Sequence, residues 1–334
     1  MWDVLQVNLA SPLALAFVLG IVSRLLKSEL SLPRDLYASL SIYLLLALGL
    51  KGGVELSQTS LNALFWPAVV TVGLGLFTPV SAYLVLRRLG RFPIADAAGI
   101  AAHYGSVSAV TFIAAQQFVQ TMNQPAEGFL PTLLTLLEIP GIQLALAIGA
   151  IQMARERAAQ QAGQSAAEAP RPMAEVLHEV LTSRSMILMV GGLIIGCLMG
   201  EQGYEPVKPF FEGMFKGALT LFLLEMGLAA GARLGDLKSV GLFLLGFGMI
   251  LPVLHGGLGV LLGHWSGLSI GGAAVLGTMA ASASYIAAPP AVRMTLPEAN
   301  PTYYLTAALA ITFPFNIVLG IPLYYQMATL LAAH

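Results

Sequence analysis

Charged residues are scarce in this chain. Lysine, arginine, aspartate and glutamate together make up 10% of the 334 residues, against about 25% in ordinary soluble domains. Hydrophobic residues make up 57%, and the mean hydropathy is +0.80. This composition excludes a soluble globular domain and indicates an integral membrane protein. A net charge of −1 also excludes the strongly basic surface that a nucleic-acid partner needs.

Cysteine and the familiar hydrolytic motifs are nearly absent as well. The one cysteine, Cys197, excludes an intramolecular disulfide, and its place in an apolar run predicts core packing. The sequence contains no GxSxG and no HExxH, because His178-Glu179 continues as V-L-T. No pair of intramembrane aspartates is present either. These absences argue against an intramembrane hydrolase and favour a protein that is not an enzyme.

Apolar stretches are long and uninterrupted, which predicts membrane-spanning helices rather than the alternating short strands of an outer-membrane barrel. At about 20 residues per span, the chain has room for ten helices with short loops. The N-terminal MWDVLQVNLAS lacks a basic n-region, so we expect the first apolar segment to be retained. The ten expected spans are 11–27, 36–51, 64–86, 93–119, 130–153, 185–201, 214–231, 240–264, 268–294 and 302–330.

Lysine and arginine are distributed unevenly between the loops. With the N-terminus outside, thirteen of the sixteen fall in cytoplasmic loops, and only Lys51, Lys208 and Lys216 fall outside. The positive-inside rule therefore predicts that both termini lie outside a bacterial inner membrane.

One sizeable loop, 154–184, divides the chain into halves 1–153 and 185–334 and is expected on the cytoplasmic side. Its first part, RERAAQQAGQSAAEAPRP, is typical of a linker. Its second part has apolar residues at helical spacing, which predicts an amphipathic helix on the inner membrane face. These residues are Met173, Val176, Leu177, Val180 and Leu181.

The two halves resemble each other in sequence. GLKGGVEL at 49–56 matches GLAAGARL at 227–234, and IADAAGIAAHYGSVS at 94–108 matches IGGAAVLGTMAASAS at 270–284. Further along, the proline of LEIPGI matches that of ITFPFN, and the offset stays nearly constant at 178, 176 and 174 residues. Five spans per half force the second half into the membrane upside down. Inverted repeats are the architecture of secondary transporters, although some channels share it. The expected fold is therefore all-α, with ten membrane helices in two inverted five-helix repeats.

The fourth span of each half contains residues that interrupt a helix. Gly105 and the Ala-Ser run at 280–284 weaken helix propensity, and Pro289 and Pro290 remove backbone donors. Irregular backbone at membrane depth lines a cavity or is buried in protein. We therefore expect helices 4 and 9 to be discontinuous, to cross near the bilayer centre and to present N-termini to a small anion. The alternative is close helix packing through small residues. The expected substrate-binding residues are Gly105, Ser106, Ser108, Thr111, Ser282, Ala283, Ser284 and Tyr285.

Few ionisable side chains lie inside the expected spans, where burying a charge is costly. Glu138 stands before Pro140, and Thr312 holds the equivalent place before Pro314. Together with Ser108, these side-chain oxygens form the expected cation site, and no other metal site is predicted. Structural or gating roles are expected for Glu225, His103 and His255.

Two stretches resemble the sodium-dependent bicarbonate transporters first recognised in cyanobacteria. They are S-A-S-Y-I-A-A-P-P-A-V-R with L-P-E-A-N-P-T-Y-Y, within 282–304, and G-S-V-S-A-V-T at 105–111. The likeness extends over all ten spans. It implies sodium-driven import of bicarbonate by a homotrimer. It also implies a gate or scaffold of spans 1, 2, 6 and 7, and a core of spans 3–5 and 8–10 with substrate at the crossover of spans 4 and 9. A PII-like regulator at the cytoplasmic face is implied as well.

Tyr285 departs from the family pattern, which has an aspartate at this place, and Ala283 and Ala287 stand in place of serines. Either Glu138 supplies the negative charge for sodium, or the coupling ion differs, or the substrate does. The central loop is also shorter than in cyanobacterial members.

The expected function is import of a small monovalent anion, as sodium-coupled bicarbonate symport by alternating access. The alternatives are symport of another small anion, such as a short carboxylate, and a membrane receptor that binds without transporting. A cation/proton antiporter is disfavoured, because its crossover usually needs carboxylates that this crossover lacks.

Overall fold

The computed structural model describes residues 6, 10–160, 182 and 184–333 of the chain. Every regular element within these residues is helical, which confirms the all-α class expected from the composition. The linker residues up to Gln160 continue a long helix. The amphipathic helix expected from Met173 to Leu181 lies outside the described residues.

Seven stretches of helix in the described residues are long and apolar enough to cross a membrane, as in a multi-pass membrane protein. The difference from the ten expected spans has a physical origin. Two expected spans contain short helices, Pro12–Leu25 and Ile270–Ala280, and two others belong to one continuous stretch. The seven stretches are Asp35–Gln58, Leu61–Arg88, Ile94–Thr121, Leu130–Glu156, Ile187–Tyr204, Lys208–Trp265 and Pro301–Ala332.

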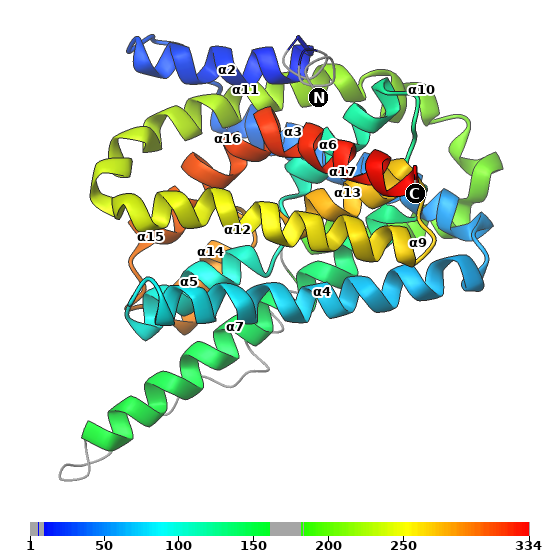
Figure 1. Cartoon of the computed structure of the whole chain (residues 1–334). Coiled ribbons are helices and arrows are strands. Elements are labelled where there is room, and N and C mark those ends of the chain that lie inside the picture. Colours follow the sequence, from blue (N-terminus) through cyan, green and yellow to red (C-terminus); the bar gives the residue numbers. More distant parts are fainter. Residues whose placement is uncertain (1–5, 7–9, 161–181, 183, 334) are drawn as a thin grey trace.

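Four helices pack as two close pairs (Figure 1). Glycines allow the close approach. A Cβ atom at Gly53 would overlap the carbonyl oxygen of Leu193, and a Cβ atom at Gly227 would overlap that of Phe17. The short helix α10 (Lys208–Gly213) lies between α9 and α11 in the chain. The pairs are α2 (Pro12–Leu25) with α11 (Phe215–Arg233), and α3 (Arg34–Gln58) with α9 (Arg184–Tyr204).

The remaining helices form a second group in which the same contacts occur twice. They are α4 (Leu61–Arg88), α5 (Ile94–Tyr104), α6 (Ala109–Thr121), α7 (Leu130–Gln160), α12 (Leu237–Trp265), α13 (Ile270–Ala280), α14 (Ala288–Thr295) and the C-terminal helix (Pro301–Ala332). In the first half, α4 packs on α5 and α7, and α5 packs on α7. In the second half, α12 packs on α13 and on the C-terminal helix, and α13 packs on that helix.

The C-terminal helix is irregular near its middle. Pro314 and Pro322 lack the N–H that a regular helix requires, which accounts for wider turns before each of them. Such π-helical turns frequently occur at functional sites. The helix consists of α15 (Pro301–Leu305), the π-helical η2 (Thr306–Thr312), α16 (Phe313–Phe315), the π-helical η3 (Asn316–Gly320) and α17 (Ile321–Ala332).

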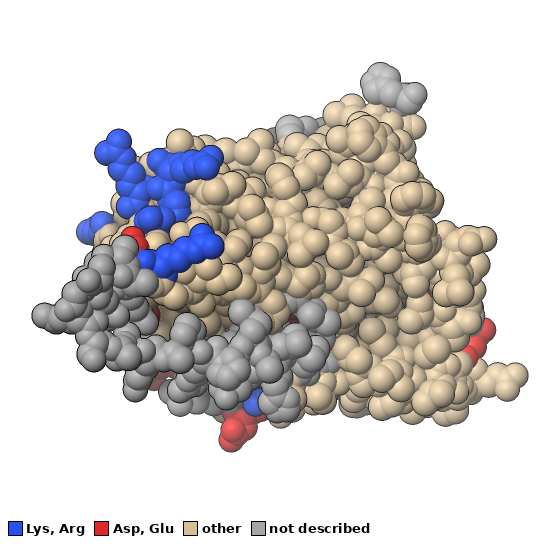
Figure 2. Space-filling model, turned by 90° about the horizontal axis from the view of Figure 1, so that it is seen from below, with Lys and Arg blue, Asp and Glu red and all other residues tan. Residues whose placement is uncertain are grey.

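Basic side chains gather at one end of the molecule. Figure 2 shows most of the lysine and arginine side chains of that face at one end, with a broad uncharged surface beyond them. The last turns of three helices, α2, α4 and α11, carry Arg24, Arg87, Arg88 and Arg233. This asymmetry is the pattern that the positive-inside rule describes.

Exposed apolar side chains cover much of the helix surface. Leu198 on α9 is 83% exposed and Leu242 on α12 is 86% exposed, as suits contact with lipid. Cys197 is exposed as well, so its expected place in the core is wrong. A lipid-facing surface is as apolar as a core, and apolar neighbours therefore do not distinguish the two.

Candidate functional site

Two helices are interrupted in the middle of the molecule. Helix α5 ends at Tyr104 and α6 begins at Ala109, whereas α13 ends at Ala280 and α14 begins at Ala288. The proline pair, Pro289 and Pro290, lies in the first turn of α14, where a helix needs no N–H donor. The prolines therefore follow the interruption and start the next helix.

Two hydrogen bonds join the interruptions, residues 105–108 and 281–287, which we call the crossover. The N–H of Ser108 donates to Ser282 Oγ (3.0 Å), although the two residues are 174 positions apart. The N–H of Ser284 donates to the carbonyl oxygen of His103 (2.8 Å). The two serine-containing stretches that match in the sequence thus lie in direct contact.

The same serines accept hydrogen bonds from the chain that leaves the crossover, and Ser108 is the N-cap of α6. Ser108 Oγ accepts from the N–H of Thr111 (3.2 Å) at the start of α6, and Ser284 Oγ accepts from the N–H of Ala287 (3.2 Å) before α14. The N-termini of α6 and α14 bring partial positive charge to the crossover, and the C-termini of α5 and α13 bring partial negative charge. One small region can therefore stabilise an anion and a cation side by side.

The backbone carbonyl groups of Gly105 and Ala281, at matching places in the two halves, have different neighbours. Asn316 Nδ2 donates to the carbonyl oxygen of Ala281 (2.8 Å), and Tyr324 OH donates to Asn316 Oδ1 (3.2 Å). In the first half, the carbonyl of Gly105 packs against Gly141, where a Cβ atom would overlap it. The second half of the crossover therefore carries an amide donor, and the first half carries none at the matching place.

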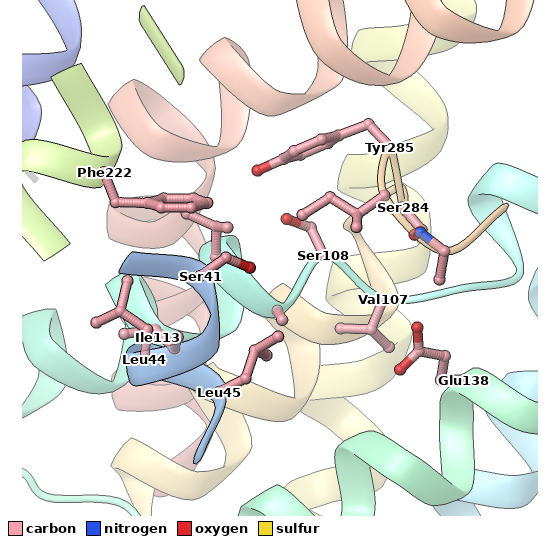
Figure 3. Close-up of a pocket in the computed structure, with 14 residues that line it drawn as sticks. Ser41, Leu44, Leu45, Val107, Ser108, Ile113, Glu138, Phe222, Ser284 and Tyr285 are labelled. Carbon is pink, nitrogen blue, oxygen red and sulfur yellow. The ribbon is translucent and has the colours of Figure 1, made fainter. Parts of the chain in front are cut away.

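A small cavity lies beside the crossover (Figure 3). The volume open to the centre of a water molecule is about 20 Å³, which is enough for one water. Polar and apolar side chains share its walls, and they come from both groups of helices. Lining residues are Ser41, Leu44, Leu45, Val107, Ser108, Ala109, Val110, Ile113, Glu138, Phe222, Ser284, Tyr285, Ile286 and Ala287.

The expected site residues divide into two sets. Four of them, Ser108, Ser284, Tyr285 and Glu138, line this cavity. Sequence reasoning missed the cavity wall that α3 and α11 provide, because nothing in the sequence pairs these helices with the crossover. The expected residues that are buried nearby without lining the cavity are Gly105, Ser106, Thr111, Ser282 and Ala283.

Tyr285 lines the cavity, and in the view of Figure 3 its ring lies above Ser108 with the hydroxyl toward the side of Phe222. Its ring packs edge-on against Phe313, with 5.1 Å between ring centroids. Its hydroxyl is buried and lies next to the Ser108 side chain, but it completes no hydrogen bond within the described residues. A buried hydroxyl without a partner is costly, so this group is available to a ligand in the cavity.

Glu138 provides a buried carboxylate on α7, with the residue 5% exposed. The buried hydroxyl of Ser106 lies next to this carboxylate but completes no hydrogen bond among the described residues. Thr312 lies in a separate network, because its Oγ1 donates to the Gly248 carbonyl (2.7 Å) and contacts Tyr104 OH (2.5 Å). The structure therefore brings Glu138 to the cavity and leaves Thr312 outside it.

Three further ionisable residues make contacts that suit structural roles. The Nδ1 atom of His103 lies 2.8 Å from the Gly99 carbonyl, and the Nε2 atom of His255 lies 2.7 Å from Ser81 Oγ. Glu225 accepts from the N–H of Leu32 (3.4 Å). None of the three lines the cavity beside the crossover.

Two carboxylates fasten the outer ends of the broken helices. Asp96, in the first turn of α5, accepts from the N–H of Asn300 (2.7 Å) at the start of the C-terminal helix. Glu127, between α6 and α7, accepts from the N–H of Ser269 (2.5 Å) at the start of α13. Each contact joins one half of the chain to the other. The broken helices are thus held at their outer ends as well as at the crossover.

Replacing Asp96 tests this contact. Asp96→Ala leaves the N–H of Asn300 without its partner, and we expect a loss of about 1–3 kcal/mol in the free energy of unfolding. Asp96→Asn keeps an oxygen acceptor and should lose clearly less. Thermal unfolding of the purified protein in detergent measures both. As a control, Asp236→Ala removes only a half-exposed pair with Arg233 and should change little. Equal melting of Asp96→Ala and the unchanged protein would contradict the assignment.

Comparison with known families identifies the superfamily of the chain. The sequence model of the Na⁺-dependent bicarbonate transporter superfamily matches residues 12–329. The comparison with curated proteins finds no match. The match covers nearly the whole chain, so the chain belongs to the Na⁺-dependent bicarbonate transporter superfamily and is a transporter rather than an enzyme.

Proposed function

We propose that this member of the superfamily imports bicarbonate together with sodium across a bacterial inner membrane by alternating access. One observation carries the proposal. The crossover places a buried carboxylate, the hydroxyls of three serines and Tyr285, and the start of α6 around one small cavity, with α14 beginning beside it. Such a site suits a monovalent anion and a monovalent cation bound together.

The repeated contacts support two inverted repeats of five helices. The pair α3 with α9 corresponds to the pair α11 with α2, when the second half is matched to the first. The contacts among α4, α5 and α7 correspond to those among α12, α13 and the C-terminal helix. On this interpretation the stretch Lys208–Trp265 crosses the membrane twice, and α2 and α13 also cross it or part of it, which gives ten spans.

The same packing divides the helices into two proposed bodies. Helices α2, α3, α9 and α11 form the proposed gate or scaffold, and the remaining long helices form the core. The cavity has walls from both, since Ser41 and Phe222 belong to the gate and the crossover belongs to the core. Movement of the core along the gate would expose the crossover to one side of the membrane and then to the other.

The anion is proposed to bind at the N-termini of α6 and α14. Ser108, Ser284 and the free hydroxyl of Tyr285 supply donors there. Bicarbonate has four heavy atoms, whereas the cavity admits about one water. We therefore infer that the gate wall moves away from the crossover when substrate enters.

Sodium is proposed to bind in the first half of the crossover. Glu138 supplies the negative charge that the family's aspartate would supply at Tyr285, and the Ser106 hydroxyl lies beside it. In the second half, Asn316 already donates to the Ala281 carbonyl, so an amide donor occupies the place that a cation would need. This asymmetry favours Glu138, Ser106 and Ser108 as ligands and disfavours Thr312.

The remaining proposals follow from the family and from charge. The basic end of the molecule is placed in the cytoplasm, with both termini outside. A homotrimer is proposed, with exposed apolar side chains of the gate helices at the subunit contacts. A PII-like regulator is proposed to bind near the central loop on the cytoplasmic side.

A short carboxylate is the second candidate substrate. Apolar side chains form much of the cavity wall, including Leu44, Leu45 and Ile113. Such a wall suits the alkyl group of a carboxylate such as acetate better than it suits bicarbonate.

Uptake of labelled bicarbonate into proteoliposomes tests the coupling and the substrate. We expect uptake with an inward sodium gradient and at least tenfold less with potassium, because only sodium completes the site beside Glu138. Labelled acetate is the matched comparison. Equal uptake in sodium and potassium would exclude sodium coupling, and uptake of acetate alone would favour the second candidate. Binding without any flux would indicate a receptor.

Two substitutions test the sodium subsite. Glu138→Gln should raise the half-saturating sodium concentration at least tenfold, which corresponds to about 1.4 kcal/mol or more. Ser106→Ala should raise it by a smaller factor, because a neutral oxygen ligand is lost. Glu205→Gln and Ser239→Ala change exposed residues that do not line the cavity beside the crossover and serve as controls. A sodium dependence that is the same in Glu138→Gln as in its control would refute the assignment.

A further inference from the structure

A second and much larger cavity opens between the gate and the core. About 290 Å³ of it is open to the centres of water molecules. Its walls come from α3, α10 and α11 on the gate side, and from α6 and the start of α7 on the core side. Under the proposed orientation it lies toward the outer face of the membrane. We call it the outer cavity.

The outer cavity lies directly above the crossover cavity along two helices. On α3, Leu44 and Leu45 line the crossover cavity, and Leu48 lines the outer cavity. On α6, Ile113 lines the first, and Gln117 lines the second. These steps of three or four residues correspond to one helical turn, about 5.4 Å. The two cavities therefore lie about one helical turn apart along both helices.

Basic side chains are concentrated at this cavity. Of the three lysines expected on the outer side, Lys51 and Lys216 line it and Lys208 does not. Lys51 pairs with Glu212 (3.4 Å). Lys216 forms no ion pair with a described residue, so its ammonium group is available to an anion.

Two buried polar atoms at the same cavity lack partners within the described part of the chain. Tyr204 is 4% exposed and lines the cavity, and its hydroxyl forms no hydrogen bond. The Oε1 atom of Gln117 is likewise buried and unsatisfied. A phenol donor, an ammonium donor and an amide acceptor suit an oxyanion that also carries one O–H group, because each of the three then gains a partner.

Acidic side chains keep the affinity of the outer cavity for an anion low. Glu55 and Glu212 also line the outer cavity and balance the two lysines. A site with no net charge holds a small anion without trapping it, and so allows the anion to pass on to the crossover.

We propose that the outer cavity is a second anion site, which captures the substrate oxyanion before it reaches the crossover. Lys216, Tyr204 and Gln117 are its ligands. The inference rests on the proposed function for the identity of the anion, and on charge and burial for the site itself.

The transport test compares a lysine that lines the outer cavity, Lys216, with one that does not, Lys208. Lys216→Gln should raise the half-saturating bicarbonate concentration about threefold to tenfold with an unchanged maximal rate, as expected for the loss of one charge-assisted hydrogen bond. Tyr204→Phe should raise it by a smaller factor. Lys208→Gln, the matched control, should leave it unchanged. If Lys216→Gln and Tyr204→Phe both behave as Lys208→Gln does, the proposal is wrong.

A binding test separates this site from the proposed function. With exposed Cys197 replaced by alanine, Gln120→Cys places a thiol on the cavity wall. Bicarbonate should slow modification of that thiol by an anionic methanethiosulfonate reagent in detergent, and Lys216→Gln should abolish the protection. Protection in a protein that transports no bicarbonate would uphold the outer site and refute the proposed function. Absence of protection at about 100 mM bicarbonate, where a site with a Kd of about 10 mM is roughly nine-tenths occupied, would overturn the outer site.

Discussion

The structure depends on the hydrogen bonds that tie the two helix interruptions together. The N–H of Ser108 meets Ser282 Oγ, and the N–H of Ser284 meets the His103 carbonyl. Backbone that leaves a helix at membrane depth needs other partners, since lipid offers none. Each interruption supplies a hydrogen-bond partner to the backbone of the other, so the two halves of the crossover stabilise each other. The pairing also aims two helix N-termini and two C-termini at one point, which is why one small site can hold ions of both signs.

The two halves of the crossover have similar interrupted helices but different polar side chains around them. Asn316 closes the second half by donating to the Ala281 carbonyl, whereas the first half keeps Glu138 and the unsatisfied Ser106 hydroxyl. On the proposed function, this difference accounts for Tyr285 at a place where the resemblance implies an acid. The proposed charge for sodium is then Glu138 on the neighbouring helix, and the proposed role of the tyrosine hydroxyl is to bind the anion.

The sequence predicts a good part of this arrangement. Glycine, serine and proline mark where the fourth and ninth spans are interrupted, because these residues disfavour a helix whatever surrounds them. Which polar residues meet was harder to predict. Glu138 and Thr312 match in the repeat, yet Thr312 bonds to Gly248 and Tyr104. Asn316 could have been suspected as an amide in an apolar span. The exposure of Cys197 could not have been predicted, since lipid-facing and core positions are equally apolar in sequence.

The central claim is that one crossover site holds bicarbonate and sodium together. Equilibrium binding of labelled bicarbonate to the purified protein, at rising sodium concentrations, tests it most directly. Sodium should raise the bicarbonate affinity, and bicarbonate should raise the sodium affinity by the same factor. Ser282→Ala should weaken both, because it releases the N–H of Ser108. Bicarbonate affinity that does not depend on sodium, or that survives Ser282→Ala unchanged, would contradict the account.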